Sequence, residues 1–143
     1  MKMISLILIA ILFFSCSNDP VPLQYGKDAC HTCKMTLMDK KFGAEIVTKK
    51  GKVYKFDDLN CMVNFYNSGY EPEENIAHLL VVDFAQPEKL IDTKHTFFVK
   101  SDKLRTPMAS QVAAFEREED YKKFKKEWNG ILLGWGEVVT QFK

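Results

Sequence analysis

The sequence predicts a domain of the α+β class with antiparallel sheet, in which the order strand, strand, helix, strand occurs twice. Two observations lead to this fold class. Short segments rich in β-branched and aromatic residues, bounded by turn residues, are typical of strands. Segments with apolar residues at three- and four-residue spacing are typical of amphipathic helices, and they lie between such strands in both halves of the chain.

The first half of the chain carries the clearer pattern. Lys50 and Gly51 mark a turn between the first two strands. Asp57 or Asp58 is suited to cap the helix that follows, and Gly69 is suited to end it. The next segment is a continuous apolar run, which predicts a buried central strand. The three predicted strands cover residues 42–49, 53–56 and 77–84.

The second half repeats this order in a weaker form. Residues 95–100 predict a strand, and Thr106 begins a short segment that continues to Phe115. The charged residues 118–128 predict an amphipathic helix. Residues 130–139 predict a closing strand, and its glycines imply bends or bulges. The predicted buried face of the helix consists of Tyr121, Phe124 and Trp128.

The first 15 residues have the features of a secretory signal, with a basic start, an apolar run and the small residue Ser15. The apolar run is shorter than the roughly 20 residues that a membrane-spanning helix needs. The segment that ends at Cys16 resembles a bacterial lipobox, so Cys16 is predicted to carry lipid; an ordinary secretory signal is the alternative. The predicted parts are a signal, a lipidated flexible tether and a folded domain, at residues 1–15, 16–27 and 28–143.

This organisation predicts a protein of the bacterial cell envelope, anchored to the membrane by the lipid on Cys16 and facing the periplasm or the exterior. The formal net charge is +1, and removal of the signal, which contains one lysine, brings it to about zero. Without a basic stripe, nucleic acid is not an expected partner. The remaining aliphatic and aromatic residues are sufficient for a core without disulfides.

Three of the four cysteines remain for the domain, and two of them form a Cys-x-x-Cys motif at Cys30 and Cys33. Metal sites and dithiol redox sites share this spacing. Met35 favours a metal site, because a redox motif has no use for a thioether. Thiolate and thioether ligands are soft and together favour Cu(I). Zinc rarely takes methionine, and a zinc ribbon would need a second cysteine pair, whereas Cys61 is single.

Several of these residues have a structural alternative. Cys30 and Cys33 are able to form a disulfide in an oxidising compartment. His31 fits a solvated loop as well as it fits a ligand. Met38 is expected in the core beneath the first strand, and core packing is slightly favoured over metal binding for Cys61.

Short motifs follow one another at residues 30–35, 56–62, 81–84, 91–92, 106–110 and 112–115. In order and spacing they resemble the NosL family of copper-binding lipoproteins, over nearly all of the mature chain. The resemblance implies two β-β-α-β units, similar to the organomercurial lyase accessory fold, and a metal-binding domain over residues 28–143. It also implies a metal chaperone, not an enzyme, that binds one Cu(I) and delivers it to nitrous oxide reductase, close to the membrane assembly machinery.

The resemblance further implies the copper ligands. Cys33 and Met35 match the cysteine and the methionine of the family's copper element. Met108 matches a methionine that would complete the site from the second unit. Cys30 and Cys61 are additional cysteines that are expected to assist, and they are compatible with a branch of the family acting in another copper or respiratory context.

Lys34 departs from the family pattern, in which glycine is usual between the two ligands. Lysine fits there if the φ angle is negative. Its charge would then partly offset the charge of the thiolates.

Two functions of other classes stay open. A thiol–disulfide oxidoreductase would use Cys30 and Cys33, but it needs a low cysteine pKa at a helix N-terminus, and the segment after Cys33 leads to a strand. A lyase acting on carbon–metal bonds would use the paired cysteines with Asp57 or Asp58 as the acid. That alternative rests on fold analogy alone.

Overall fold

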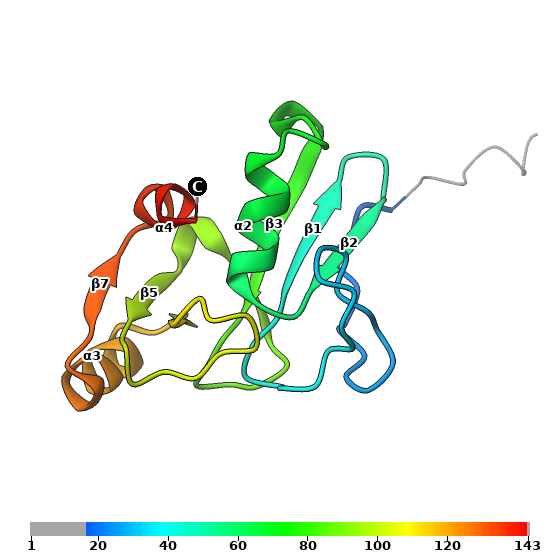
Figure 1. The fold of residues 1–143 in the computed structure, drawn as a ribbon. Coiled ribbons are helices and arrows are strands. Elements are labelled where there is room, and N and C mark those ends of the chain that lie inside the picture. The colour runs from blue at the N-terminus through cyan, green and yellow to red at the C-terminus, as the bar shows by residue number, and fades with distance from the viewer. Residues whose placement is uncertain (1–16, 143) are drawn as a thin grey trace, which may run out of the picture.

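The computed structural model describes residues 17–142. The predicted signal and the lipid attachment at Cys16 lie outside these residues and stay predictions. The strands of the described part form two antiparallel sheets, one of four strands and one of three, with three α-helices around them. The predicted α+β class is therefore confirmed, and the two units lie side by side (Figure 1). No helix in this range combines the length and the apolar character that a membrane span requires.

The first unit has the predicted order of elements. They are β1 (Ala44–Thr48), β2 (Val53–Phe56), α2 (Leu59–Asn67) and β3 (Ile76–Val82). A short strand that the sequence did not indicate, β4 (Leu90–Asp92), extends the sheet to the order β2-β1-β3-β4. The strand β3 is therefore central, as predicted. Single 3-10 turns at Glu73–Asn75 and Thr93–His95 flank β3 and β4.

The turn between β1 and β2 requires glycine. Gly51 has a φ of 80°, in the left-handed region that side chains disfavour. Its amide donates a hydrogen bond to the carbonyl of Thr48 at 2.9 Å. A Cβ at this position would lie 2.7 Å from the carbonyl oxygen of Ser17. The hairpin turn is therefore in close contact with the start of the described chain.

Part of the predicted flexible tether packs against the first sheet. Leu23 is buried in the core, and the hydroxyl of Tyr25 donates to the carbonyl of Phe42 at 2.6 Å. The amide of Val21 donates to Oε1 of Glu45 at 2.8 Å. Glu45 is fully buried in β1, and this burial raises the pKa of its carboxyl. The packed part of the chain thus begins before the predicted end of the tether.

The second unit also has the predicted order. Its elements are β5 (Phe97–Lys100), β6 (Val112–Phe115), α3 (Glu118–Trp128) and β7 (Ile131–Leu133). They form a sheet of order β6-β5-β7, in which both strand pairs are antiparallel. The helix α3 has the predicted bounds and is followed by Asn129 in the left-handed conformation, with a φ of 51°. The second β-β-α-β unit is confirmed.

The closing strand predicted for residues 130–139 is wrong in its second part, because β7 is followed by the helix α4 (Trp135–Gln141). The start of α4 is fixed by local hydrogen bonds. The carboxylate of Glu137 accepts from the amide of Gly134 at 2.7 Å, and the amide of Val138 donates to the Gly134 carbonyl at 3.0 Å. These bonds turn the chain into a helix that buries Val138 completely.

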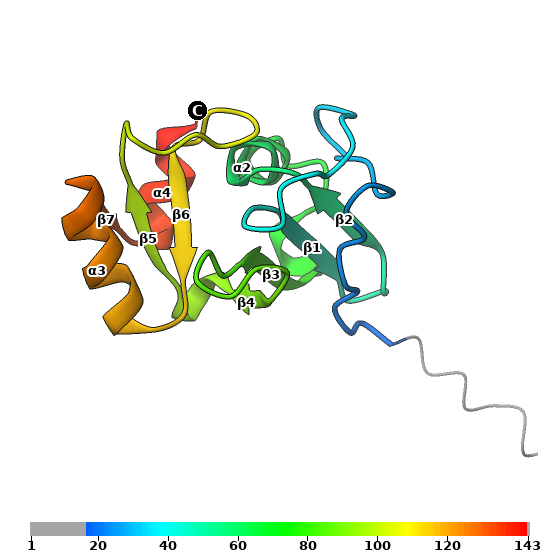
Figure 2. The ribbon, with the colours of Figure 1, turned by 90° about the horizontal axis from the view of Figure 1, so that it is seen from below.

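The predicted apolar face of α3 packs against the second sheet. Phe124 stacks on Phe115 of β6 with the ring centroids 5.3 Å apart. Trp128 meets Phe84 edge-on at 5.1 Å. Both residues and Tyr121 are half-buried rather than fully enclosed. The helix lies on the side of the second sheet that faces away from α2 (Figure 2).

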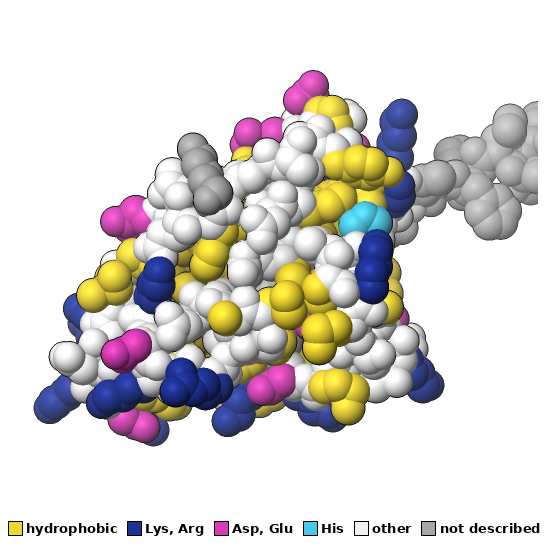
Figure 3. Space-filling view, in the orientation of Figure 1, with side chains coloured by type: hydrophobic (Ala, Val, Ile, Leu, Met, Phe, Trp, Pro, Cys, Tyr) yellow, Lys and Arg dark blue, Asp and Glu magenta, His cyan; other side chains and the backbone are white. Residues whose placement is uncertain are grey.

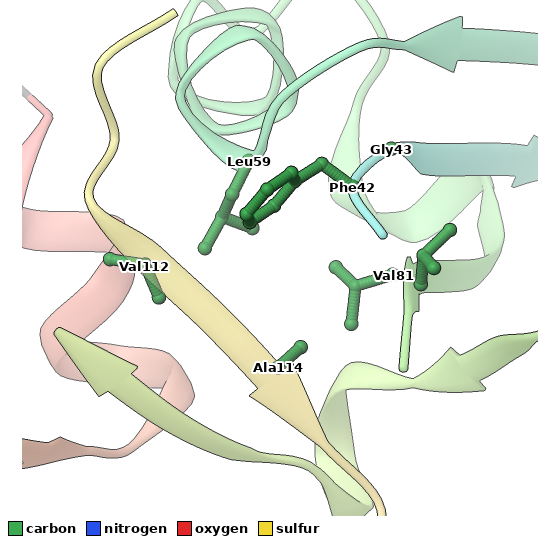
Figure 4. A pocket seen from close by; sticks show the side chains of 7 residues that line it. Phe42, Gly43, Leu59, Val81, Val112 and Ala114 are labelled. Carbon is green, nitrogen blue, oxygen red and sulfur yellow. The ribbon is translucent and has the colours of Figure 1, made fainter. Parts of the chain in front are cut away.

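The two units share one apolar core. The amide of Phe84, just after β3, donates to the carbonyl of Ala114 in β6 at 2.8 Å. Beside this contact lies a cavity of about 20 Å³ whose lining comes from both units (Figure 4). The lining residues are Phe42, Gly43, Leu59, Val81, Val82, Val112 and Ala114. Most of these side chains belong to the buried core, so this small space is part of the core.

Candidate metal centre

The Cys-x-x-Cys motif lies on a loop that main-chain hydrogen bonds close. The amide of Cys30 donates to the carbonyl of Met35 at 2.8 Å, and the amide of Lys34 donates to the carbonyl of Cys30 at 3.0 Å. An isolated antiparallel bridge joins Ala29 and Thr36, the residues that flank Cys30 and Met35. The closed loop turns Cys30 inwards, leaving it 1% exposed, while Cys33 stays half-buried at the surface.

The condition under which lysine fits at position 34, a negative φ, is not met. Its φ is 67°, in the left-handed region, where a side chain costs roughly 1 kcal/mol or more. The turn needs this conformation because the Lys34 amide reaches back to the carbonyl of Cys30. The ammonium of Lys34 donates to the carbonyl of His31, which offsets part of the cost.

The opposite wall of the site is the start of α2. Asp57 directly follows β2, and Cys61 lies in the first turn of the helix. The hydroxyl of Thr32 donates to the carbonyl of Cys61 at 2.9 Å. The amide of His31 donates to the carbonyl of Lys55 in β2 at 2.7 Å. These two contacts hold the loop against β2 and α2, so residues far apart in sequence meet.

Four potential ligand atoms gather where the loop and the helix meet. They are the sulfurs of Cys30, Cys33 and Cys61 and a carboxylate oxygen of Asp57, all within 4.8 Å of one another. Both carboxylate oxygens of Asp57 lie 3.5 Å from the Cys33 sulfur. Cys30, Cys61 and Asp57 are buried, so Cys33 is the member of this cluster that solvent reaches most easily.

The electrostatics single out Cys30 as the thiolate of the cluster. The pKa of Cys30 is lowered to about 6, chiefly by a hydrogen bond from Cys61 and also by the backbone amides of Cys33, Asp57 and Thr32, which together outweigh the opposing effect of burial. The same hydrogen bond, together with burial, raises the pKa of Cys61. Burial also raises the pKa of Cys33. All three cysteines are free, so the alternative disulfide between Cys30 and Cys33 is not formed.

The segment around Met108 is fastened to the same end of α2. Oδ2 of Asp58 accepts from the Thr106 hydroxyl at 2.9 Å, the Met108 amide at 2.7 Å and the Ser110 amide at 3.2 Å. The side-chain amide of Asn60 donates to the carbonyl of Met108 at 3.0 Å. Asp58 is the residue before α2, but its side chain does not cap the helix as predicted. Its carboxylate binds residues of the second unit instead.

A family model described as NosL matches residues 20–142. The chain belongs to the NosL family. Among solved structures, the fold is similar to the crystal structure of the copper chaperone NosL from Shewanella denitrificans, with a TM-score of 0.66 and 19% identity over 85% of this chain and 96% of that one. The predicted family and fold are thus confirmed. No curated protein matches the chain.

The two methionines of the NosL resemblance differ in exposure. Met35 is 55% exposed on the loop that carries Cys30 and Cys33. Met108 is half-buried and packs against the core. Their metal ligation stays a prediction. Met38 was expected in the core but is 72% exposed, so that expectation is wrong. Hydrophobic side chains are visible at the surface on the face that Figure 3 presents.

His31 is a packing residue of the first unit. Its ring meets Tyr54 edge-on at 4.9 Å and Phe65 at 5.1 Å between centroids. Burial and the nearby charges of Lys34 and Lys52 lower the pKa of the imidazole. The ring is therefore neutral at physiological pH, and it lies outside the cluster of four ligand atoms.

Asp57 is the member of the cluster that sequence reasoning did not place among the ligands. It was considered as a helix cap or as the acid of a lyase, on equal terms with Asp58. The structure separates the two, because Asp57 faces the thiols whereas Asp58 binds residues 106–110. The available signal was the four-residue spacing between Asp57 and Cys61 at the start of a predicted helix.

Proposed function

We propose that this chain is an envelope lipoprotein that binds one Cu(I) as cargo and hands it to a copper enzyme, with no catalytic activity of its own. Membership of the NosL family and a fold shared with a protein described as a copper chaperone support this function. The observation that carries it is the position of Cys33. This half-buried thiol lies within 4.8 Å of the sulfurs of the buried Cys30 and Cys61, and the exposed Met35 follows it by two residues.

The copper ligands in this proposal are Cys33, Met35 and Met108. Thiolate and thioether sulfur suit Cu(I), which accepts low coordination numbers. The Met108 amide donates to the Asp58 carboxylate, and the side-chain amide of Asn60 donates to the Met108 carbonyl, so the main chain of Met108 is held at the start of α2, the helix that carries Cys61. A low-coordinate site also suits a carrier, because an incoming ligand finds an open position on the ion.

Release proceeds by ligand exchange in this proposal. Met35 is the most exposed of the ligands, so it is the first that a donor group of the acceptor replaces. Cys33 follows and recovers a proton, because burial raises its pKa. Copper then passes between proteins without entering solution and without a change of oxidation state. The NosL resemblance implies nitrous oxide reductase as the acceptor.

The buried thiolate of this site argues against the oxidoreductase alternative. A dithiol catalyst attacks its substrate with an accessible thiol whose pKa is low. Here the lowered pKa belongs to Cys30, which is 1% exposed, whereas the pKa of the accessible Cys33 is raised. A dithiol catalyst needs one cysteine that is both accessible and low in pKa. Here Cys30 has the low pKa and Cys33 is the accessible thiol.

The proposal is tested by Cu(I) titration of the purified chain under anaerobic conditions, with mass spectrometry to count the bound ions. The wild-type chain should bind one Cu(I), and Cys33→Ser should abolish binding at stoichiometric copper. Met38→Leu is the matched control, since Met38 is exposed nearby and is assigned no role. Tight binding retained in Cys33→Ser contradicts the assignment, and transfer to metal-free nitrous oxide reductase tests the acceptor.

A further inference from the structure

We infer that the hairpin turn between β1 and β2, residues 49–52, is the surface by which this domain lies on a phospholipid bilayer. The turn carries Lys49, Lys50 and Lys52. The inference rests on the lipid attachment at Cys16 that is part of the proposed function. It adds to that function the orientation of the domain at the membrane, and it does not depend on which residues bind copper.

The start of the described chain is fastened to the domain at this turn. The carbonyl oxygen of Ser17 lies so close to Gly51 that a Cβ there would be 2.7 Å away. Further along, the Val21 amide donates to Oε1 of Glu45 at 2.8 Å, and Leu23 is buried in the core. The chain therefore contacts the domain from Ser17 onwards and is not a free tether.

Covalent geometry then brings the lipid attachment to the turn. Successive α-carbons are about 3.8 Å apart, so the α-carbon of Cys16 is that far from the α-carbon of Ser17. An unpacked tether over residues 16–27 would instead span a root-mean-square distance of roughly 20 Å. Acyl chains on Cys16 that enter a bilayer therefore bring the hairpin turn to the headgroup layer.

The side chains at this end of the domain suit a headgroup layer. All three lysines of the turn are exposed. The ammonium of Lys52 lies 4.8 Å from the ring centroid of Tyr54 and 5.8 Å from that of Tyr70, which is 64% exposed. Tyrosine and lysine join an apolar body to a polar tip, which suits the boundary between bilayer and water. Near an anionic surface, each lysine favours the bound orientation by about fivefold.

Acidic side chains beside the turn limit this attraction. The amide of Lys49 donates to the carbonyl of Asn75 at 2.8 Å, which brings the 3-10 turn with Glu73 and Glu74 next to the hairpin. Asp19 is exposed in the segment that leads from Ser17. The lysines therefore orient the domain, whereas the lipid supplies the affinity for the bilayer.

This orientation limits the height of the candidate metal centre above the bilayer. The strand β2 leads from the hairpin turn to Asp57, and a rise of about 3.3 Å per residue allows no more than roughly 17 Å between Lys52 and Asp57. In both ribbon views α3 lies on the opposite side of the molecule from the start of the described chain (Figures 1 and 2). A copper acceptor therefore has to reach the centre close to the membrane surface.

The test uses the full lipidated chain on vesicles of phosphatidylcholine with a minor fraction of phosphatidylglycerol, treated briefly with a water-soluble acetylating reagent. The comparison variant has a flexible Gly-Ser linker between Cys16 and Ser17, long enough to free the domain by roughly 20 Å. Mass spectrometry should show the three hairpin lysines acetylated roughly fivefold more slowly in the wild-type chain. The exposed Lys122 and Lys126 of α3 should react equally in both chains. The same linker added after Lys143 is the matched control and should leave the protection unchanged.

A charge variant tests the part of the lysines in this orientation. Lys49→Glu combined with Lys50→Glu should speed the acetylation of Lys52 on these vesicles by at least about twofold. Lys122→Glu combined with Lys126→Glu, on the opposite side of the molecule, should leave it unchanged. Equal acetylation of Lys52 in the two double variants would refute the attraction of the turn to anionic headgroups.

The same samples separate this inference from the proposed function. A mature chain whose mass shows no lipid on Cys16 contradicts the proposed anchoring, and the inference falls with it. A lipidated chain that floats with the vesicles overturns the inference alone if its hairpin lysines react as fast as those of the linker variant. Protection of the α3 lysines in their place would also overturn it, because the domain would then lie on its other side.

Discussion

Lys34 holds a left-handed main chain between two proposed copper ligands, Cys33 and Met35. Its φ of 67° is required by the hydrogen bond that closes the loop onto the Cys30 carbonyl. A side chain in this conformation is strained, whereas glycine adopts it freely. The loop thus carries strain at the residue where the family pattern has glycine.

Replacing Lys34 by glycine should relieve this strain. We expect Lys34→Gly to raise the free energy of unfolding of the metal-free chain by about 0.5–1 kcal/mol, since relief of the strained φ exceeds the extra chain entropy of glycine. Lys34→Ala loses the same ammonium contact but keeps the strain, so it should not stabilise. Urea unfolding of the two variants measures the difference, and equal stabilities would contradict the strain argument.

Residues of the centre were predictable from the sequence only where their chemistry is local. The sequence indicates Cys30, Cys33 and Met35 as ligands by their spacing within one loop. Asp57 does not, because its role depends on the loop lying against the start of α2, which the Thr32 contact to the carbonyl of Cys61 secures. That contact joins segments far apart in sequence, and no local pattern encodes it.

At the scale of elements, residues 106–110 are held by α2 rather than by their own sheet. Three donors from this segment converge on one oxygen of Asp58, which is fully buried. Ala109 and Gln111 have φ angles of 58° and 56°, so the segment is wound tightly around the carboxylate. The position of Met108 thus depends on a residue of the first unit.

Removal of this carboxylate should loosen the connection between the units. Asp58→Ala leaves three donors without their acceptor and should lower the free energy of unfolding by at least about 2 kcal/mol. Thr106→Val removes one donor to Asp58 and the acceptor of the Gln111 amide, but it leaves the Met108 and Ser110 amides on Asp58, so it should cost less, about 1 kcal/mol. Because Met108 loses its anchor in the first variant only, Cu(I) affinity should fall more in Asp58→Ala. Chemical unfolding and copper titration of both variants test this, and equal losses would refute the role of the anchor.

Elements with strong periodicity were predictable, and those set by a single contact were not. The helix α3 was expected at its observed bounds, since its charged and aromatic residues alternate with helical spacing. Residues 130–139 are apolar and glycine-rich, which suits a strand equally well. The hydrogen bond between Glu137 and the Gly134 amide selects the helix α4 there.

At the scale of the whole molecule, the two units share a buried core. Val81 of the first unit and Val112 of the second line the same small cavity, and both belong to one buried cluster. The metal cluster lies at the edge of the first unit, while Met108 comes from the second. Copper binding through both units therefore requires that they stay packed together.

Cooperative unfolding of the two units is the final expectation. Val81→Ala enlarges the existing cavity and should lower the free energy of unfolding by about 2 kcal/mol. Trp128 lies in α3 of the second unit, and Trp135 begins α4, where its ring packs against Phe98 of β5 and Tyr66 of α2. Cys61 is buried in the first unit. If the core is continuous, the substitution lowers the denaturant concentration at the midpoint of two transitions by the same amount. One transition is followed by tryptophan fluorescence and the other by exposure of the Cys61 thiol. A lower midpoint for Cys61 exposure with an unchanged midpoint for fluorescence would mean that the units unfold separately. A copper site shared between the units would then lack its structural support.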